Sequence, residues 1–355
     1  MASSIIDELR LDDRVAMDRL AAELFGESNA LKIIPCLPGT LDEYHDELVA
    51  ASIHASAALA GNPMPLDEAS VELERKVGDP ELPSGPTVAR ARREITNLAL
   101  AYKPLPIGRV ESSVFGVSEG FVKKVQTVLA QGTSLSGLGD YVPSTDGKRT
   151  QGQTQAEMLR LITWINASEA TNHGPLVRAA LFHYGMLRLR PFADANGRTA
   201  RFFETSILTV AGVRFASLWL PVHYHRNIDQ YLAFCQDEAS NVSAFVTFML
   251  HGVRQGLELA RLRLIDPLRT LALKAYFDAL RHDKTVKTRL HQLLHLLIDH
   301  QESFQIRDLY LRQPFKLLYD EVSEHTTRRD LNKLIALGLL TKDGTSYAFN
   351  RNALG

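Results

Sequence analysis

Apolar residues recur along most of the chain at the three- and four-residue spacing of an amphipathic helix, whereas the alternation typical of strands is scarce. One helical pattern ends at Gly61-Asn62-Pro63, a glycine and a proline of the kind that commonly follow a helix. The sequence therefore predicts a mainly α fold. The clearest helical ranges are about 41–60, 87–102, 121–129, 158–165 and 175–189.

Stretches rich in glycine and proline divide the chain into three expected parts. Residues 1–102 form an N-terminal helical region, residues 103–265 a central helical unit, and residues 266–355 a part with short helices and a strand-like tail. Within the central unit, residues 132–152 are rich in Gly, Ser, Thr and Asp, which predicts a loop with a short hairpin.

The composition is that of a globular protein in a reducing compartment. The chain has 355 residues, of which 45% are hydrophobic and 23% charged, and its formal net charge of −1 gives it no overall attraction to nucleic acid or membrane. Two cysteines, Cys36 and Cys235, are too few for a disulfide framework. The sequence shows no signal-peptide pattern and no apolar run long enough for a membrane span, so we expect a cytoplasmic protein.

Residues 190–201 carry the candidate chemistry, in the string Arg-Pro-Phe-Ala-Asp-Ala-Asn-Gly-Arg-Thr-Ala-Arg. A helix is expected to end before Pro191, and another to begin near Asn196 and Gly197. The first amides of a helix lack partners and lie at the positive end of its dipole, so they bind anions. Gly197 would let a phosphate approach this backbone closely.

Charged side chains in the same string complete a candidate polyphosphate site. Arg198 and Arg201 lie three residues apart, so their guanidinium groups share the first turn of the expected helix. Asp194 comes just before them and is a candidate Mg²⁺ ligand, because proteins usually hold Mg²⁺ with one or two carboxylates and the phosphates of the substrate.

This string resembles the motif of the Fic (Fido) family, His-x-Phe-x-Asp/Glu-Gly/Ala-Asn-Gly-Arg-x-x-Arg, and departs from it at the first position, where Arg190 replaces the histidine. The flanks are similar as well: His183 lies seven residues upstream, and Asn227 and Tyr231 resemble an Asn-x-x-x-Tyr pair near the bound base. Residues 94–97 resemble a helix that precedes the family core. The resemblance covers roughly residues 40–260.

The resemblance implies a helical Fic bundle that moves AMP from ATP onto a protein hydroxyl. Asp194 would hold Mg²⁺, Phe192 would anchor the loop, and phosphates would be bound by Asn196, Gly197, Arg198 and Arg201. Relatives align a target protein on a β-hairpin flap. Residues 137–149 should supply it here, although they contain no convincing pair of alternating strands.

Arg190 changes the chemistry that the resemblance implies. A guanidinium stays protonated, so it cannot act as the general base that the family histidine provides. Losing such a base typically costs about 10²–10⁴ in rate. Two interpretations stay open: Arg190 adds a positive charge beside the phosphates, or it fills the space where the target hydroxyl would enter. We expect His183 to be a buried structural residue and no substitute base.

A second departure lies upstream. Residues 56–62, Ser-Ala-Ala-Leu-Ala-Gly-Asn, resemble the inhibitory helix of the family, Ser/Thr-x-x-x-Glu-Gly/Asn, in which the glutamate pairs with the last arginine of the motif. Ser56 matches this pattern, but Ala60 stands at the glutamate position. Arg201 is therefore expected to lack this clamp.

The C-terminal residues resemble a winged helix-turn-helix, as many bacterial Fic proteins carry at this end. Residues 326–340 predict an amphipathic helix and residues 341–350 a hairpin with an Asp-Gly turn. If this part binds DNA, Thr327, Arg328, Arg329 and Asn332 would enter the major groove and Lys342 would meet a phosphate. The alternative is packing or homodimerisation.

Three functions follow from these patterns. The first is a Fic-type protein adenylyltransferase that binds ATP or a related nucleotide with Mg²⁺, with transfer weakened or absent because of Arg190. The second is a nucleotide-sensing pseudoenzyme or DNA-binding regulator that acts through the winged helix. The third is a helical scaffold with a vestigial site.

Overall fold

The computed structural model describes residues 4–37, 39–75, 85–102, 116–133, 137–236, 241–300 and 302–354. The chain divides into two compact units. The first comprises Met1–Pro35 and Gly39–Leu262, and the second comprises Cys36–Pro38 and Arg263–Gly355. The boundary between them falls within one long helix, α12 (Val242–His282).

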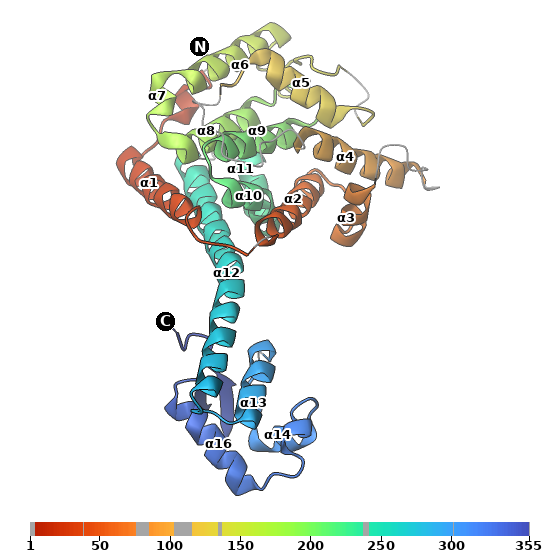
Figure 1. Ribbon diagram of the computed structural model, residues 1–355. Helices are drawn as coiled ribbons and strands as arrows, with labels where there is room; N and C mark the ends of the chain where they lie inside the picture. The colour runs from red at the N-terminus through yellow and green to blue at the C-terminus, as the bar shows by residue number, and fades with distance from the viewer. Residues whose placement is uncertain are drawn as a thin grey trace. The chain divides into compact units, whose positions relative to one another are not determined.

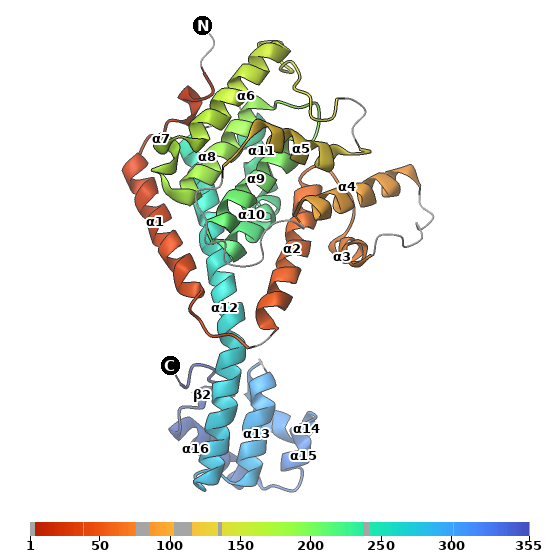
Figure 2. The same ribbon diagram turned by 45° about the horizontal axis from the view of Figure 1, so that its top comes forward.

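The first unit is helical, as predicted (Figures 1 and 2). No helix in the described ranges is long and apolar enough to cross a membrane. Besides the start of α12, the unit contains η1 (Asp7–Leu9), α1 (Arg14–Leu31), α2 (Thr40–Ala58), α3 (Leu66–Glu74), α4 (Pro86–Tyr102), α5 (Glu119–Ala130), α6 (Gln151–Asn166), α7 (Ser168–Thr171), α8 (Gly174–Leu189), α9 (Asn196–Val210), α10 (Arg214–Arg226) and α11 (Ile228–Gln236).

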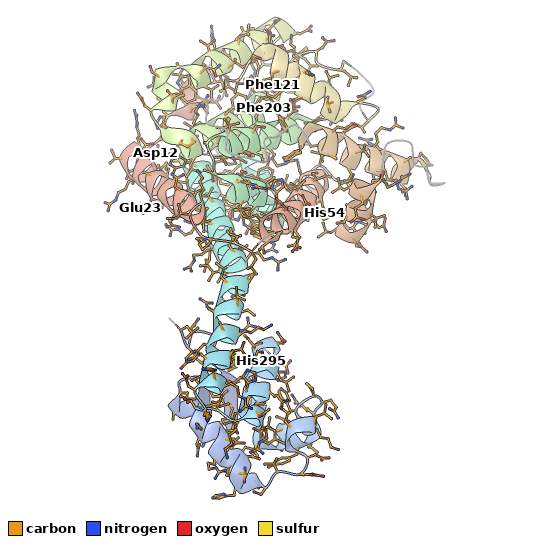
Figure 3. The ribbon with its side chains drawn as sticks, viewed as in Figure 1. Asp12, Glu23, His54, Phe121, Phe203 and His295 are labelled. Atoms are coloured by element: carbon orange, nitrogen blue, oxygen red, sulfur yellow. The ribbon has the colours of Figure 1, made fainter. Side chains whose placement is uncertain are left out.

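Helices α8 and α9 form the centre of this unit, and the segment between them is the motif loop. Both helices are buried on nearly every side, which is the pattern of core helices. Phe203 of α9 contacts Phe121 of α5 and Phe182 of α8, with ring centroids 5.2 and 5.5 Å apart (Figure 3). The loop therefore starts and ends on rigid elements, which favours a well-positioned site.

Helices α10 and α12 cross closely because small residues line the crossing. A methyl group added at Gly256 of α12 would come within 3.0 Å of the Cα atom of Ala216 and 2.9 Å of the Cβ atom of Trp219. Gly252, one turn earlier, lies equally close to His223. The two glycines thus allow α12 to pack closely against α10.

The hairpin flap predicted for residues 137–149, all of which the structure describes, is wrong. Two strands do not pair with each other there; instead Ser144 and Arg149 close a turn, and Tyr141 forms an isolated antiparallel bridge with Phe192 of the motif loop. Gly137, Gly139 and Gly147 all adopt positive φ, which breaks the extended backbone that a hairpin strand needs.

The second unit has its own core and a small sheet. After the end of α12 come α13 (Thr288–Asp299), β1 (Phe304–Gln305), α14 (Ile306–Leu311), α15 (Lys316–Tyr319), α16 (Glu324–Ala336), β2 (Leu340–Asp343) and β3 (Ser346–Phe349). The strands are antiparallel in the order β1-β3-β2. The predicted helix and hairpin are confirmed as α16, with Ser323 as its N-cap, and as β2–β3.

The prediction that Thr327 would face DNA is wrong. Its side chain is fully buried, and its hydroxyl lies 2.6 Å from the Tyr310 hydroxyl and donates to the Ser323 carbonyl. Thr327 therefore fixes α16 within the unit. Arg328, Arg329 and Asn332 are exposed on the same helix, and Lys342 is exposed on β2.

Candidate functional site

The motif loop is shaped by two residues with left-handed backbone. Arg190 ends α8 with φ 45° and ψ 59°, and Ala195 precedes α9 with φ 62° and ψ 15°. Ala195 is the N-cap residue of α9 and has no side-chain oxygen, so no side chain caps the helix there. The first amides of α9 are thus left to serve an external anion.

Asn196 stabilises the loop with its side chain, which differs from the predicted contact with phosphate. Its Oδ1 accepts a hydrogen bond from the Phe192 amide at 2.9 Å, and its Nδ2 donates to the Phe192 carbonyl at 2.6 Å. Both polar atoms of the side chain are therefore used within the loop. Only the backbone amide of Asn196 remains as a candidate phosphate ligand.

Phe192 is buried, as expected for an anchor, and two residues that the sequence pattern did not single out support it. The Tyr141 ring packs against the Phe192 ring with centroids 5.3 Å apart. Gln126 of α5 is also buried; its Nε2 donates to the Asp194 carbonyl, and its Oε1 accepts from the Gly139 amide. Gln126 thus joins the motif loop to the segment that the flap prediction covered.

Arg198 is buried and already engaged by protein groups. Its guanidinium donates to the Asp194 carboxylate at 3.2 Å and to the Leu129 carbonyl at 3.3 Å, and it lies 3.8 Å from the Glu94 carboxylate. Asp194 also accepts from the Ala195 amide at 2.6 Å. The Asp194 side chain is 34% exposed, which leaves it open on one side to a cation.

Arg201 lacks the glutamate contact, as the Ala60 substitution predicts, but it is still held by the helix that the sequence linked to inhibition. Its Nε donates to the Ser56 hydroxyl at 3.0 Å, its Nη2 to the Ser56 carbonyl at 2.8 Å, and its Nη1 to the Tyr231 hydroxyl at 2.9 Å. Ala60 has no carboxylate, so Arg201 has no ion pair at this position. Neutral hydrogen bonds to Ser56 and Tyr231 hold the guanidinium group instead. A Cβ atom at position 197 would lie 3.0 Å from Arg201 Nη1, so Gly197 also makes room for this guanidinium.

A buried polar chain continues from Tyr231. The Tyr231 hydroxyl lies 3.0 Å from His183 Nε2, and His183 Nδ1 lies 3.0 Å from the Glu204 carboxylate, which also accepts from the Tyr224 hydroxyl. His183 and Glu204 are fully buried. His183 is therefore a structural residue, as predicted.

Asn227 does not join the residues that line the site. It is exposed at the end of α10, where its Nδ2 donates to the His223 carbonyl at 2.8 Å. Tyr231, one turn later, does line the site. Of the predicted Asn-Tyr pair, only Tyr231 lines the cavity. Asn227 instead forms hydrogen bonds at the end of α10, just before α11 begins.

The predicted residues other than Asn227 and Ser56 line one cavity of about 270 Å³. Arg190 is exposed at its edge and also lines a larger neighbouring cavity of about 1010 Å³, which is bordered by charged residues that include Arg149 and Glu157. The smaller cavity is lined by Leu59, Ala60, Leu187, Arg190, Ala193, Asp194, Ala195, Asn196, Gly197, Arg198, Arg201, Tyr231, Leu232 and Cys235.

Residues 118–208 match the model of the Fic/DOC family. This part of the chain is therefore similar to the Fic/DOC family. It is 25% identical over 271 residues to protein adenylyltransferase Fic of Culex quinquefasciatus, and 23% identical over 251 residues to that of Drosophila melanogaster. These alignments cover 72% and 68% of this chain. The chain spans about half the length of these curated relatives, 49% and 48%.

Solved structures show the same fold. A Fic family protein from Desulfovibrio desulfuricans superposes with a TM-score of 0.52 at 20% identity, over 95% of this chain and 96% of its own. Fic-1 of C. elegans, residues 134–508, gives a TM-score of 0.53 at 17% identity, over 70% of this chain and 71% of its own. At these identities the likeness defines the fold alone.

Proposed function

We propose that the cavity at the start of α9 binds the phosphates of ATP or a related nucleotide with Mg²⁺, and that AMP transfer to a protein hydroxyl is weak or absent. The observation that carries this proposal is the convergence of Arg190, Asp194, Arg198 and Arg201 with the uncapped first turn of α9 on one cavity. The curated relatives are named as protein adenylyltransferases, which supports the same ligand class.

The charges around the cavity support an anionic ligand. Three guanidinium groups line it, against the single carboxylate of Asp194. At an effective dielectric of about 20, one pair of opposite charges about 4 Å apart gains roughly 4 kcal/mol before the cost of desolvation. The cavity of about 270 Å³ suits a phosphate chain, since pockets for whole drug-sized ligands hold about 300–1,000 Å³.

Asp194 is the residue that would hold Mg²⁺. Its carboxylate lines the cavity and is partly exposed, while its bonds to Ala195 and Arg198 fix its orientation. A bound Mg²⁺ would neutralise phosphate charge. The Asn196, Gly197 and Arg198 amides at the start of α9 would bind phosphate oxygens from the other side.

Arg190 would bind the nucleotide but could not take the proton from a target hydroxyl. Its guanidinium remains charged, and His183 cannot replace it because His183 is fully buried and bonded to Tyr231. Phosphoryl-type transfer depends mainly on positioning and charge. Because the proposed site already supplies the charged groups, the base is the missing part, and restoring it should restore transfer.

Two measurements test this proposal. Calorimetry with ATP, ADP and GTP in the presence of Mg²⁺ should show binding, which Asp194→Asn should weaken. Labelled ATP should modify lysate proteins or the chain itself with Arg190→His, about 10²–10⁴ times faster than with wild type. Arg190→Gln is the control, since it removes the charge without adding a base. Absence of nucleotide binding by both wild type and Arg190→His would refute the proposal.

DNA binding by the second unit is the alternative function. The order α13-β1-α14-α15-α16-β2-β3, with its sheet order β1-β3-β2, fits a winged helix, and Arg328, Arg329 and Asn332 are exposed on α16. Arg328 is paired with Glu324, so Arg329 is the better test. Fluorescence anisotropy with duplex DNA at 50 and 200 mM salt should show salt-sensitive binding that Arg329→Ala weakens and Arg307→Ala, on α14, does not.

A homodimer is the competing use of this unit. Light scattering coupled to size exclusion would detect it. If the Arg329→Ala variant still forms a dimer and the wild type binds no DNA, the function of the second unit is homodimerisation. The two cysteines of the chain are too few for a disulfide framework, which suits the proposed location in a reducing cytoplasm.

A further inference from the structure

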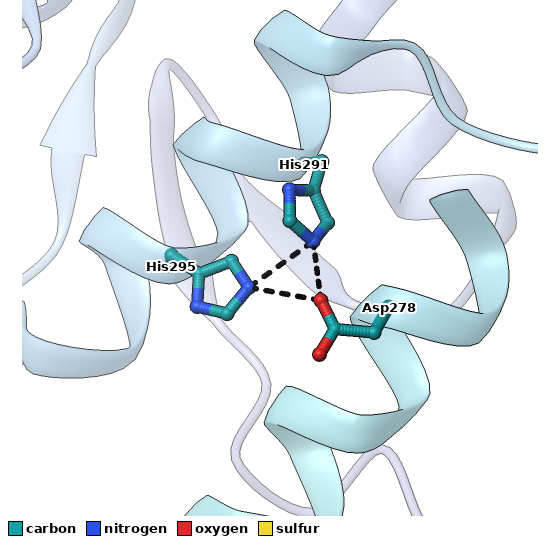
Figure 4. A group of neighbouring side chains, drawn as sticks. All are labelled: Asp278, His291 and His295. Carbon is teal, nitrogen blue, oxygen red and sulfur yellow. Dashed lines mark hydrogen bonds and ion pairs between the residues drawn. The ribbon is translucent and has the colours of Figure 1, made fainter. Parts of the chain in front are cut away.

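Three side chains of the second unit point to one spot, and none of them belongs to the motif. His291 and His295 lie one turn apart on α13, and Asp278 lies in the last turns of α12 (Figure 4). His291 Nε2 is 2.7 Å from Asp278 Oδ1 and 3.2 Å from His295 Nε2, and His295 Nε2 is 3.7 Å from Asp278 Oδ1.

These separations match the edges of a metal coordination tetrahedron. Zn²⁺ binds imidazole nitrogen at about 2.0–2.1 Å and carboxylate oxygen at about 2.0–2.2 Å, so neighbouring ligand atoms lie about 3.3–3.5 Å apart. The three observed distances, 2.7, 3.2 and 3.7 Å, bracket this value. Histidines at positions i and i+4 of one helix also recur as a metal-binding pair, because both rings project from the same face.

The protonation of the group favours a cation over hydrogen bonding alone. Two Nε2 atoms that face each other can share only one proton between them, and the Asp278 oxygen needs a donor of its own. A divalent ion would satisfy the two nitrogen lone pairs and the carboxylate together.

Packing holds the two rings in place while leaving one side open. The His295 ring lies edge-on to the buried Phe277 at 5.7 Å, and the His291 and His295 rings meet edge-to-face at 4.6 Å. The His291 and His295 side chains are 21% and 33% exposed, and that of Asp278 is 67% exposed. Three protein ligands with a solvent-facing fourth position form the arrangement of an open zinc site.

We propose that Asp278, His291 and His295 form a binding site for one divalent transition-metal ion, with Zn²⁺ the preferred ion, that joins α12 to α13. Imidazole and carboxylate ligands suit Zn²⁺, and Ni²⁺ and Co²⁺ should bind as substitutes. The ion would tie the end of α12 to the first helix after it, and so stabilise the second unit. The site is separate from the nucleotide cavity, and either proposal can fail alone.

The test is zinc binding by the full, untagged chain after removal of metal with a chelator. Calorimetry with zinc chloride should show one ion per chain with micromolar or tighter affinity, and the second unit should melt several degrees higher with zinc. Co²⁺ should give the visible absorption of a four-coordinate site. His291→Gln and His295→Gln, and the milder Asp278→Asn, should each weaken binding at least tenfold.

Control variants separate a built site from general surface chelation. His325→Gln alters an exposed histidine on α16 and should leave zinc affinity unchanged. Circular dichroism of the three site variants should match wild type, because the altered side chains are partly or largely exposed. Zinc affinity weaker than about 100 µM, or equal affinity in wild type and in the double variant His291→Gln, His295→Gln, would overturn the proposal.

Discussion

Arg201 and Ser56 lie 145 positions apart and are joined by two hydrogen bonds, one from Nε to the Ser56 hydroxyl and one from Nη2 to the Ser56 carbonyl. Arg201 therefore ties α2 to α9. The cavity wall on this side consists of a neutral hydrogen-bonded contact where the inhibitory motif of the Fic family would place a carboxylate.

Ser56→Ala should destabilise the first unit. The substitution removes the hydroxyl that accepts from Arg201 Nε, and a buried donor on a charged group loses its partner. We expect a loss of about 1–3 kcal/mol in the free energy of unfolding. Denaturant titration would measure it. Ser70→Ala, whose hydroxyl bonds within its own helix to the Leu66 carbonyl, should change stability far less.

Ala60→Glu should weaken nucleotide binding. Ala60 is exposed and lines the cavity, so a glutamate there would place a carboxylate against the guanidinium groups that we propose bind phosphate. We expect the dissociation constant for ATP to rise about tenfold, equivalent to about 1.4 kcal/mol. Ala60→Gln has the same shape without the charge and should bind ATP nearly as wild type does. Equal weakening by both variants would show that bulk, not charge, is responsible.

Gly256→Ala should destabilise the protein although alanine is the better helix former. The new methyl group would meet the backbone of Ala216 and the side chain of Trp219, which cannot easily move. We expect a net loss of about 1–3 kcal/mol from overpacking. Gly26→Ala in α1 is the matched control, since nothing lies within 4 Å of a Cβ atom there, and it should stabilise the protein by about 0.5–1 kcal/mol. Thermal melts of the two variants should therefore shift in opposite directions.

Stability should fall as the pH decreases below about 6.5, in part because of His223. Burial is the main cause that lowers the pKa of His223 from 6.5, against the opposing effect of its bond to Gln255. The unfolded chain then binds more protons than the folded one, so acid favours unfolding. His223→Gln should flatten the dependence of the unfolding free energy on pH between 8 and 5.5, whatever its effect at neutral pH. A slope identical to wild type would exclude this role of His223.

Local patterns were sufficient to predict the helices and the motif loop. The periodicity of residues 175–189, the proline at 191 and the Asn-Gly turn at 196 fixed the end of α8 and the start of α9. The hairpin at the C-terminal end was predictable for the same reason, because its Asp-Gly turn and alternating strands are local in sequence.

Partners that come from distant segments could not be predicted. Gln126 reaches the Asp194 carbonyl from α5, and this contact has no signature in the sequence. Residues 56–62 were linked to Arg201 by resemblance, but the bond to Ser56 itself was not predicted. Asn196 was assigned to phosphate by its place in the motif, although an Asn side chain can equally bond to its own backbone, as it does here. Thr327 was assigned to DNA from its place on one helix, without knowledge of what packs against it.

The left-handed backbone at Arg190 suits a histidine at least as well as an arginine. Arg190 has φ 45° and ψ 59°, and its amide donates to the Met186 carbonyl, a bond that does not depend on the side chain. Histidine is among the residues that adopt this conformation more readily than most, and the side chain at position 190 is exposed. A lineage could therefore exchange a proton acceptor for a permanent cation, or reverse the exchange, in a single mutational step without refolding the loop.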